Sequence, residues 1–281
     1  MGEARTTSPG TGGPTVVAAR PEFWDETVCG EVYAAGATPE QAFAHQAEER
    51  YRLIPILQPF ARLHEGRGKD VLEIGVGFGS DHCEWARSDP RALTGVDLAP
   101  RALGFTGERL KLLGLHSTLQ QADATSLPFE HGSFDLVYSW GVLHHTAHPA
   151  RAIEEVRRVL RPGGVARIMI YHLHSVAVAL LWLRFGLLAG RPARSWRDVV
   201  AHHLESPGTQ AFTVREARQL FRSFRSAEVR VELSQGDLLD GDIGRHHGSR
   251  LLPLARAVWP RWFVRTALRR QGLCLLIEAR A

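Results

Sequence analysis

A glycine-rich turn directly after an apolar segment is the feature that most constrains how this chain can fold. Residues 71–79 read VLEIGVGFG, so Gly75, Gly77 and Gly79 follow a segment typical of a buried strand. Glycine allows tight turns and a close approach of the backbone to a ligand, and a following helix offers unpaired N–H groups at its amino terminus. The G-x-G-x-G spacing differs from the G-x-G-x-x-G of dinucleotide-binding turns. The segment therefore predicts a strand–turn–helix unit that binds a nucleotide-like ligand, with a purely structural turn as the alternative.

Strand-like and helix-like segments alternate after this turn. The further predicted strands and helices of this part of the chain lie at 80–88 (helix), 92–99 (strand), 100–114 (helix), 117–123 (strand), 134–143 (strand), 150–160 (helix) and 165–172 (strand). Such alternation indicates βαβ units and a mainly parallel sheet covered by helices. The expected fold class is therefore α/β.

Two aspartates stand where predicted strands end. Asp97 ends the second strand, 22 residues after Gly75, where a carboxylate can accept hydrogen bonds from both hydroxyls of a ribose. The same carboxylate would repel a 2′-phosphate, which disfavours an NADP-like ligand. Asp123 ends the third strand, where it can accept a hydrogen bond from an adenine amino group. Capping of the next helix is a further role that Asp97 can fill.

Five motifs follow one another between Val71 and about Tyr171, namely VLEIGVGFG, GVDLAP, QADATSLPF, FDLVYSWGVLHH and LRPGG. In this order and spacing they resemble class I S-adenosylmethionine-dependent methyltransferases, in the small-molecule branch that includes ubiquinone, menaquinone and natural-product methyltransferases. The resemblance implies a Rossmann-like seven-stranded sheet with helices on both faces, an antiparallel last strand and a helical cap or lid. It also implies S-adenosylmethionine as cofactor and S-adenosylhomocysteine as product.

The resemblance assigns cofactor contacts to the positions that match its motifs. The three glycines would approach the methionyl part of the cofactor, with Glu73 supporting their loop. Asp97 would hold the ribose, and Leu98 would lie against the adenine. The other implied contacts are Asp123 and Ala124 at the adenine edge, and Ser139, Trp140 and Gly141 beside the sulfonium.

Catalytic and acceptor-binding groups are expected at the carboxyl ends of the parallel strands. His144 and His145 follow the fourth predicted strand and are candidates for a general base, which is needed only if the acceptor atom carries a proton. Tyr51, in the amino-terminal segment, is a further catalytic candidate. No metal site is expected, because a sulfonium methyl is already electrophilic. The candidate acceptor-binding residues are Tyr33, His172 and His174.

The remaining segments are expected to support this core. The predicted organisation is a disordered tail at 1–20, a helical cap at 21–68, the cofactor-binding core at 69–174, a helical lid or substrate region at 175–225, and closing strands with a basic helix of the same domain at 226–281. The tail is predicted from its Gly, Pro, Ser and Thr content, and the lid from its apolar helical pattern.

Charge and cysteine content narrow the function classes. Residues 1–190 carry 18 basic and 21 acidic residues (−3), and residues 191–281 carry 16 and 9 (+7), an excess too diffuse to predict a nucleic-acid partner. The three cysteines have no paired spacing, which favours a reducing cytoplasm. No apolar run has the length of a membrane span. We expect a small-molecule acceptor as partner, and the oligomeric state, a homodimer included, stays open.

The sequence thus predicts in-line methyl transfer from S-adenosylmethionine to an oxygen, nitrogen or carbon atom of a small, apolar metabolite. One alternative is a methyltransferase-like protein that binds the cofactor without transferring methyl, as a cyclase or a partner subunit. An RNA methyltransferase is less favoured, because SWGVLHH stands where an Asn-Pro-Pro-aromatic motif would be needed. A nicotinamide oxidoreductase is disfavoured by the glycine spacing.

Overall fold

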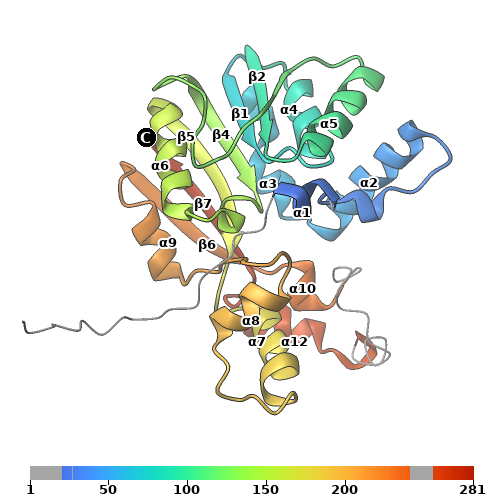
Figure 1. Cartoon of the computed structure of the whole chain (residues 1–281), viewed down its shortest axis with the longest axis vertical. Helices are drawn as coiled ribbons and strands as arrows, with labels where there is room; N and C mark the ends of the chain where they lie inside the picture. The colour runs from blue at the N-terminus through green and yellow to red at the C-terminus, as the bar shows by residue number, and fades with distance from the viewer. Residues whose placement is uncertain (1–20, 27, 241–255) are drawn as a thin grey trace, which may run out of the picture.

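The computed structural model describes residues 21–26, 28–240 and 256–281 and contains one seven-stranded mixed sheet (Figure 1). The predicted tail at 1–20 lies outside the described residues. In chain order the strands are β1 (Asp70–Ile74), β2 (Ala92–Asp97), β3 (Thr118–Gln121), β4 (Phe134–Trp140), β5 (Leu160–Tyr171), β6 (Ser226–Glu232) and β7 (Cys274–Arg280).

The strand order is β3-β2-β1-β4-β5-β7-β6, with β1 to β5 parallel and β7 antiparallel to both of its neighbours. The predicted α/β fold with an antiparallel last strand is therefore confirmed. Glu73 of β1 lies opposite Gly95 of β2 and Tyr138 of β4, so the carboxyl ends of these three strands share one edge of the sheet. Ligand sites of such sheets form at that edge.

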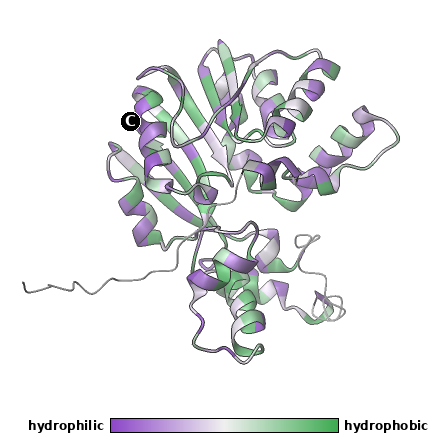
Figure 2. Ribbon diagram, viewed as in Figure 1, coloured by the Kyte–Doolittle hydropathy of each residue, from purple (hydrophilic) through white to green (hydrophobic). Residues whose placement is uncertain are grey.

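Alternation along the strands directs side chains to two apolar layers. Leu72 and Val137 belong to one layer with α6 (Pro149–Val159) and α9 (Val214–Leu220), and Val71 and Leu136 to the other with α3 (Leu57–Ala61) and α4 (Ser80–Arg87). Successive strand residues face opposite sides, so both faces of the sheet are covered. Figure 2 shows hydrophobic residues along the strands and mixed residues on the helices. A further helix, α5 (Pro100–Leu112), packs against β2, β3 and α4.

The amino-terminal segment is helical, as the sequence indicates. It contains α1 (Pro21–Glu26), η1 (Glu31–Tyr33), α2 (Pro39–Leu53), α3 and η2 (Leu63–Gly66). Helix α2 begins where Thr38 accepts a hydrogen bond from the Gln41 N–H and Pro39 occupies the first turn. Near its other end, Arg50 pairs with Asp81 of α4 at 2.6 Å, which fixes α2 beside the glycine turn.

Two insertions build a helical lobe at one end of the sheet (Figure 1). The segment after β5 supplies α7 (Val176–Trp182), the π-helical turn η4 (Leu183–Leu187) and α8 (Trp196–His203), and the segment between β6 and β7 supplies α10 (Gln235–Leu238) and α12 (Arg261–Ala267). The lobe thus draws on both the predicted lid and the predicted closing segment, whereas α9 of the predicted lid packs on the sheet. Among the described residues, no helix is long and apolar enough to cross a membrane.

Asp237 joins the lobe to the sheet. Its side chain is fully buried; Oδ1 accepts a hydrogen bond from the Ala177 N–H at 2.9 Å, and Oδ2 accepts from the N–H and hydroxyl of Ser234 and from the Leu273 N–H, each at 2.8 Å. These donors belong to the start of α7, the cap of α10 and the residue before β7. One carboxylate therefore ties both insertions to the sheet.

Replacing this carboxylate by an amide should destabilise the protein. In Asp237→Asn, one acceptor oxygen becomes an NH₂ group that faces buried donors, and we expect the free energy of unfolding to fall by about 2–4 kcal/mol. Urea denaturation monitored by circular dichroism measures the change. The matched control is Asp240→Asn, which removes a half-exposed pair with Arg261 and should cost less than about 1 kcal/mol. Equal losses in the two variants would contradict the anchoring role of Asp237.

Candidate functional site

A cavity of about 350 Å³ opens at the carboxyl ends of β1, β2 and β4. Ten of the eleven predicted cofactor residues line it: Glu73, Gly75, Gly77, Gly79, Asp97, Leu98, Asp123, Ala124, Trp140 and Gly141. Side chains from the amino-terminal segment close another side, namely Trp24, Val28, Cys29, Gln46 and Arg50. The structure thus brings the predicted cofactor motifs together around one space.

The glycine turn needs glycine for two separate reasons. Gly75, Gly77 and Gly79 all have positive φ angles, of +84°, +53° and +81°, which side chains disfavour. A Cβ on Gly75 would also lie 2.2 Å from Val142 Cγ2, so this position packs directly against the segment after β4. A Cβ on Gly77 would meet only the Cys29 carbonyl within 4 Å, so a side chain there would project into the cavity.

The side-chain carboxylate of Asp97 binds the backbone of the glycine turn. Its Oδ2 accepts a hydrogen bond from the Gly77 N–H at 3.1 Å, and its Oδ1 accepts from the Ala99 N–H at 3.0 Å. Burial raises the pKa of Asp97, and these backbone donors act in the opposite direction by stabilising the carboxylate. The next predicted aspartate, Asp123, accepts from the Thr125 N–H at 2.7 Å and from its hydroxyl at 2.8 Å. Both carboxylates are therefore fixed in place at the cavity wall.

Glu73 is paired inside the protein rather than with the glycine turn. Its Oε2 lies 2.9 Å from His82 Nδ1, and His82 Nε2 lies 2.8 Å from Ser117 Oγ. Burial raises the pKa of Glu73 well above its usual range and lowers the pKa of His82 to about 3. The pair therefore avoids a net buried charge beneath the cofactor motifs.

Arg50 and Asp81 add a charged pair that the sequence analysis did not single out. Arg50 donates two hydrogen bonds to the carboxylate of Asp81, at 3.0 and 2.6 Å, and both residues line the cavity. The hydroxyls of Tyr138 and Tyr51 donate to the same carboxylate, at 2.9 and 3.2 Å. Tyr51 does not itself line the cavity, so the structure places this predicted catalytic residue behind Asp81.

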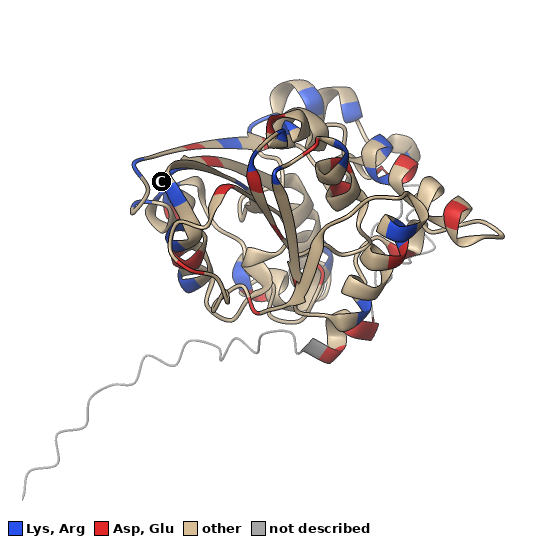
Figure 3. Cartoon of the chain, turned by 90° about the horizontal axis from the view of Figure 1, so that it is seen from above, with Lys and Arg blue, Asp and Glu red and all other residues tan. Residues whose placement is uncertain are grey.

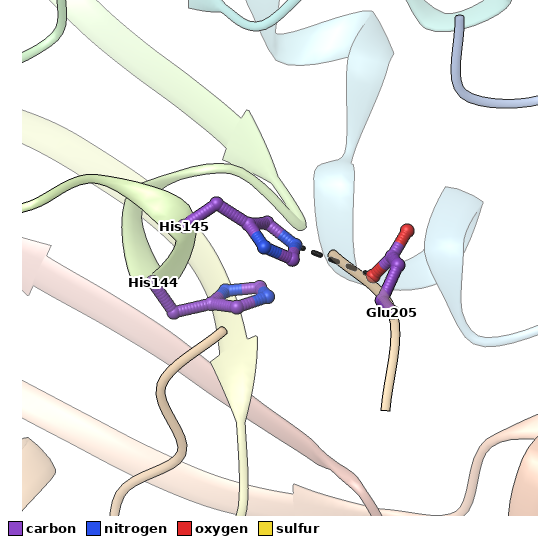
Figure 4. A group of neighbouring side chains, drawn as sticks. All are labelled: His144, His145 and Glu205. Carbon is purple, nitrogen blue, oxygen red and sulfur yellow. Dashed lines mark ion pairs between the residues drawn. The ribbon is translucent and has the colours of Figure 1, made fainter. Parts of the chain in front are cut away.

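His145 and Glu205 form the polar end of the cavity. His145 Nε2 lies 3.3 Å from Glu205 Oε2, and the Tyr171 hydroxyl donates to that oxygen at 2.6 Å. Figure 4 shows Glu205 facing the two histidines across a gap between separate segments. Burial raises the pKa of Glu205, but the neighbouring His145 ring and the Tyr171 hydroxyl outweigh this effect and hold the pKa of Glu205 below its usual range. Trp24 packs edge-on against His145 at 4.8 Å between ring centroids.

Glu205 is a site residue that no sequence pattern predicts. It belongs to the lobe insertion, 60 residues after His145, and no motif or periodicity marks the segment around it. Only the fold reveals the pairing, because the loop after α8 returns to the segment that follows β4. The contact places one carboxylate of the lobe next to His145, which the sequence predicts as a catalytic residue.

The other predicted residues lie outside the cavity wall. Ser139 is buried and donates to the Ile74 carbonyl at 2.9 Å, which joins β4 to β1. His144 is fully buried between His145 and Tyr171, at centroid distances of 4.1 and 4.0 Å. The remaining three are Tyr33 on η1, His172 with its Nδ1 3.0 Å from the Gly272 carbonyl, and His174 packed edge-on against Trp196.

Comparison with known proteins agrees with the geometry. Residues 72–168 match the family model described as a methyltransferase domain. The chain is 39% identical over 98 residues to the phthiotriol/phenolphthiotriol dimycocerosates methyltransferase of Mycobacterium leprae. That alignment covers 34% of this chain and 36% of the relative, so the chain spans about a third of the relative's length.

Two solved structures resemble the chain over most of its length, at identities that show the fold alone. One is an S-adenosylmethionine-dependent methyltransferase from Mesorhizobium loti, with a TM-score of 0.53, 20% identity and coverage of 87% of this chain and 99% of the other. The second is the cyclase SpnF, with a TM-score of 0.52, 18% identity and coverage of 88% and 83%. Residues 72–168 thus match a methyltransferase domain by sequence, and the chain shares its fold with an S-adenosylmethionine-dependent methyltransferase of known structure.

Proposed function

We propose that this protein transfers the methyl group of S-adenosylmethionine to a hydroxyl of a small, lipid-like acceptor. One observation carries the proposal: the glycine turn, Asp97 and Asp123 line the same cavity that ends at His145 and Glu205. A cofactor-binding end and an acid–base end thus share one space. The bound cofactor would supply an electrophilic methyl on its sulfonium.

The residues of the cavity fit the proposed cofactor. The missing side chain of Gly77 leaves room for the methionyl part, and the Asp97 carboxylate is positioned to accept hydrogen bonds from ribose hydroxyls. Asp123 would accept from the adenine amino group, with Leu98 and Ala124 against the ring. Arg50 would attract the methionyl carboxylate of the cofactor, because Asp81 holds the Arg50 guanidinium in place.

The acceptor would lie against Trp24 and beside the pair of His145 and Glu205. The ring of Trp24 provides an apolar contact, and the pair provides the polar group beside which an acceptor hydroxyl can lose its proton. Rate enhancement then comes mainly from holding the acceptor oxygen in line with the methyl, at about 3–3.5 Å. His144 and Tyr51 are not proposed as bases, because neither lines the cavity.

The lipid-like acceptor is supported by the relatives. The Mycobacterium leprae relative and several others are named as methyltransferases of phthiotriol and phenolphthiotriol dimycocerosates. The alignment with this relative covers 98 residues, so the acceptor is inferred from the names together with the apolar wall around Trp24 and Val28. Figure 3 shows basic and acidic residues interspersed over the chain, which does not favour a nucleic-acid acceptor.

A cyclase that binds the cofactor without methyl transfer is the second candidate function. The specific observation in its favour is the likeness in fold to the cyclase SpnF over 88% of this chain. The two functions share the cofactor end of the cavity and differ in what happens at the other end. They are therefore separated by whether methyl leaves the cofactor.

The deciding experiment combines binding and transfer. Isothermal titration calorimetry with S-adenosylhomocysteine tests the cofactor site, and tritiated S-adenosylmethionine with a panel of long-chain alcohols, phenols and amines tests transfer into the organic phase. Binding with transfer to hydroxyl compounds supports the proposal. Binding without transfer to any panel member favours the cyclase alternative, and absence of binding contradicts both.

Gly75→Ala should weaken cofactor binding. The new Cβ would meet Val142 at 2.2 Å in a backbone conformation with φ +84°, and strain of about 1–3 kcal/mol would displace the turn. Calorimetry should show at least about tenfold weaker binding of S-adenosylhomocysteine. Gly104→Ala is the matched control, because a Cβ there meets nothing within 4 Å, and its affinity should stay unchanged. An unchanged affinity in Gly75→Ala would argue against the role given to this turn.

Glu205→Gln should slow methyl transfer without weakening cofactor binding. Glutamine keeps the size of the side chain but removes the negative charge beside His145, and we expect the transfer rate to fall by about 10²-fold or more. The readout is transfer to the acceptor found in the panel, together with S-adenosylhomocysteine affinity. Asp198→Asn serves as control, because Asp198 pairs with Arg194 on the same lobe and does not line the cavity. A Glu205 variant with full activity would exclude the carboxylate from the chemistry.

A further inference from the structure

Three side chains with metal-binding atoms converge at the acceptor end of the cavity. His144 and His145 follow β4, and Glu205 follows α8; the nearest ligand atoms of the three lie within 4.8 Å of one another. In Figure 4 the ring of His144 lies beside that of His145, with a nitrogen on the side that faces Glu205. Within the part of the chain that the structure describes, no other three side chains with metal-binding atoms lie close enough together to share one ion.

His145 is already oriented as a ligand would be. Its Nδ1 lies 2.9 Å from Ser206 Oγ and 3.2 Å from Thr209 Oγ1, so this nitrogen is occupied by hydroxyls. Its Nε2 therefore points toward Glu205. This nitrogen lies 3.3 Å from the carboxylate but is not aligned for a hydrogen bond. Metal-binding histidines characteristically have the other ring nitrogen fixed by such a partner.

Glu205 has a supporting partner of the same kind. The Tyr171 hydroxyl donates to Glu205 Oε2 at 2.6 Å, and this contact holds the carboxylate toward the two histidines. Hydrogen bonds to ligating carboxylates orient them and are part of most metal sites. The Glu205 side chain is 34% exposed, and Glu205 lines the cavity. A ligand entering the cavity can thus reach the cluster.

His144 provides the observation that distinguishes a metal ion from a proton. Its side chain is fully buried, and neither ring nitrogen has a hydrogen-bond partner among the described residues. A buried polar group without a partner is rare and requires an explanation. A proton between His145 and Glu205 would satisfy that pair and would leave His144 unpaired.

We propose that His144, His145 and Glu205 together bind one divalent transition-metal ion, of the zinc type, at the acceptor end of the cavity. Two imidazoles and one carboxylate are a known donor set for such ions. Ligand distances of about 2.0–2.2 Å require donor atoms roughly 3–3.5 Å apart, so small side-chain rotations would suffice to close the cluster. Two neutral histidines and one carboxylate leave the site with one positive charge, which favours an oxygen ligand from the cavity.

The ion would define the acceptor class more narrowly. A metal-bound hydroxyl loses its proton at lower pH, so an alcohol or phenol, held by the ion through its oxygen, would be presented as the more nucleophilic alkoxide or phenolate. Its proton would pass to solvent, and the oxygen would form the new bond to the methyl carbon while the sulfonium carbon–sulfur bond breaks. This step rests on the proposed function, whereas metal binding does not. This proposed metal site differs from the expectation, drawn from the sequence, that the protein has no metal site.

Metal binding can be measured without cofactor or acceptor. The full chain is dialysed against a chelator and titrated with Zn²⁺ by calorimetry and with Co²⁺ by visible absorption, whose d–d bands report a four- or five-coordinate site. We expect one ion per chain in both titrations. We expect the affinity to fall by about 100-fold or more in Glu205→Gln and in His144→Leu.

His148→Ala is the matched control, because His148 lies in the same segment but outside the cluster, and its variant should bind the ion as the wild type does. Circular dichroism checks that each variant is folded; if His144→Leu is not, Glu205→Gln decides alone, since its side chain is partly exposed. Absence of stoichiometric binding by the wild type, or binding lost equally in His148→Ala, would overturn the proposal. A wild-type protein that binds S-adenosylhomocysteine but no metal ion defeats this inference alone, whereas a wild-type protein that does not bind S-adenosylhomocysteine defeats the proposed function.

Discussion

The contact between the glycine turn and the segment after β4 is the constraint on which the cavity depends. Gly75 can lie against Val142 only because it has no Cβ, and this close approach brings the ends of β1 and β4 together. Asp97 then fixes the same turn from the β2 side through the Gly77 N–H. Three strand ends are thus joined by two short-range contacts, and the cavity is the space that these contacts leave open.

The acceptor end is built on a different principle. His145 belongs to the cofactor motifs, but its partners Glu205, Ser206 and Thr209 come from the lobe insertion. The cofactor end therefore follows from the local sequence of the core, and the acceptor end follows from how the insertion returns to it. Loops carried on a rigid sheet commonly provide such variable chemistry.

The cofactor end of the cavity could be predicted from the sequence, whereas the acceptor end could be predicted only in part. The alternation of strands and helices predicted the parallel core, and the resemblance to methyltransferase motifs implied the ten cavity residues. Both signals lie in short continuous segments of the sequence. Glu205 could not be predicted, since its pairing with His145 spans 60 residues and is set by the packing of α8. His144 and His145 are adjacent in sequence and indistinguishable there, yet His144 is fully buried against Tyr171 and His145 lines the cavity.

The position of the lobe then has a chemical consequence. Asp237 ties the start of α7, the cap of α10 and the residue before β7 to one buried carboxylate. Helix α7 packs on α8, and the loop after α8 carries Glu205. A shift of the lobe against the sheet would therefore change the 3.3 Å separation between Glu205 and His145 before it disturbed the glycine turn. Because the two ends of the cavity are held by separate contacts, the acceptor chemistry can be altered by changes in the lobe while the cofactor end keeps its geometry.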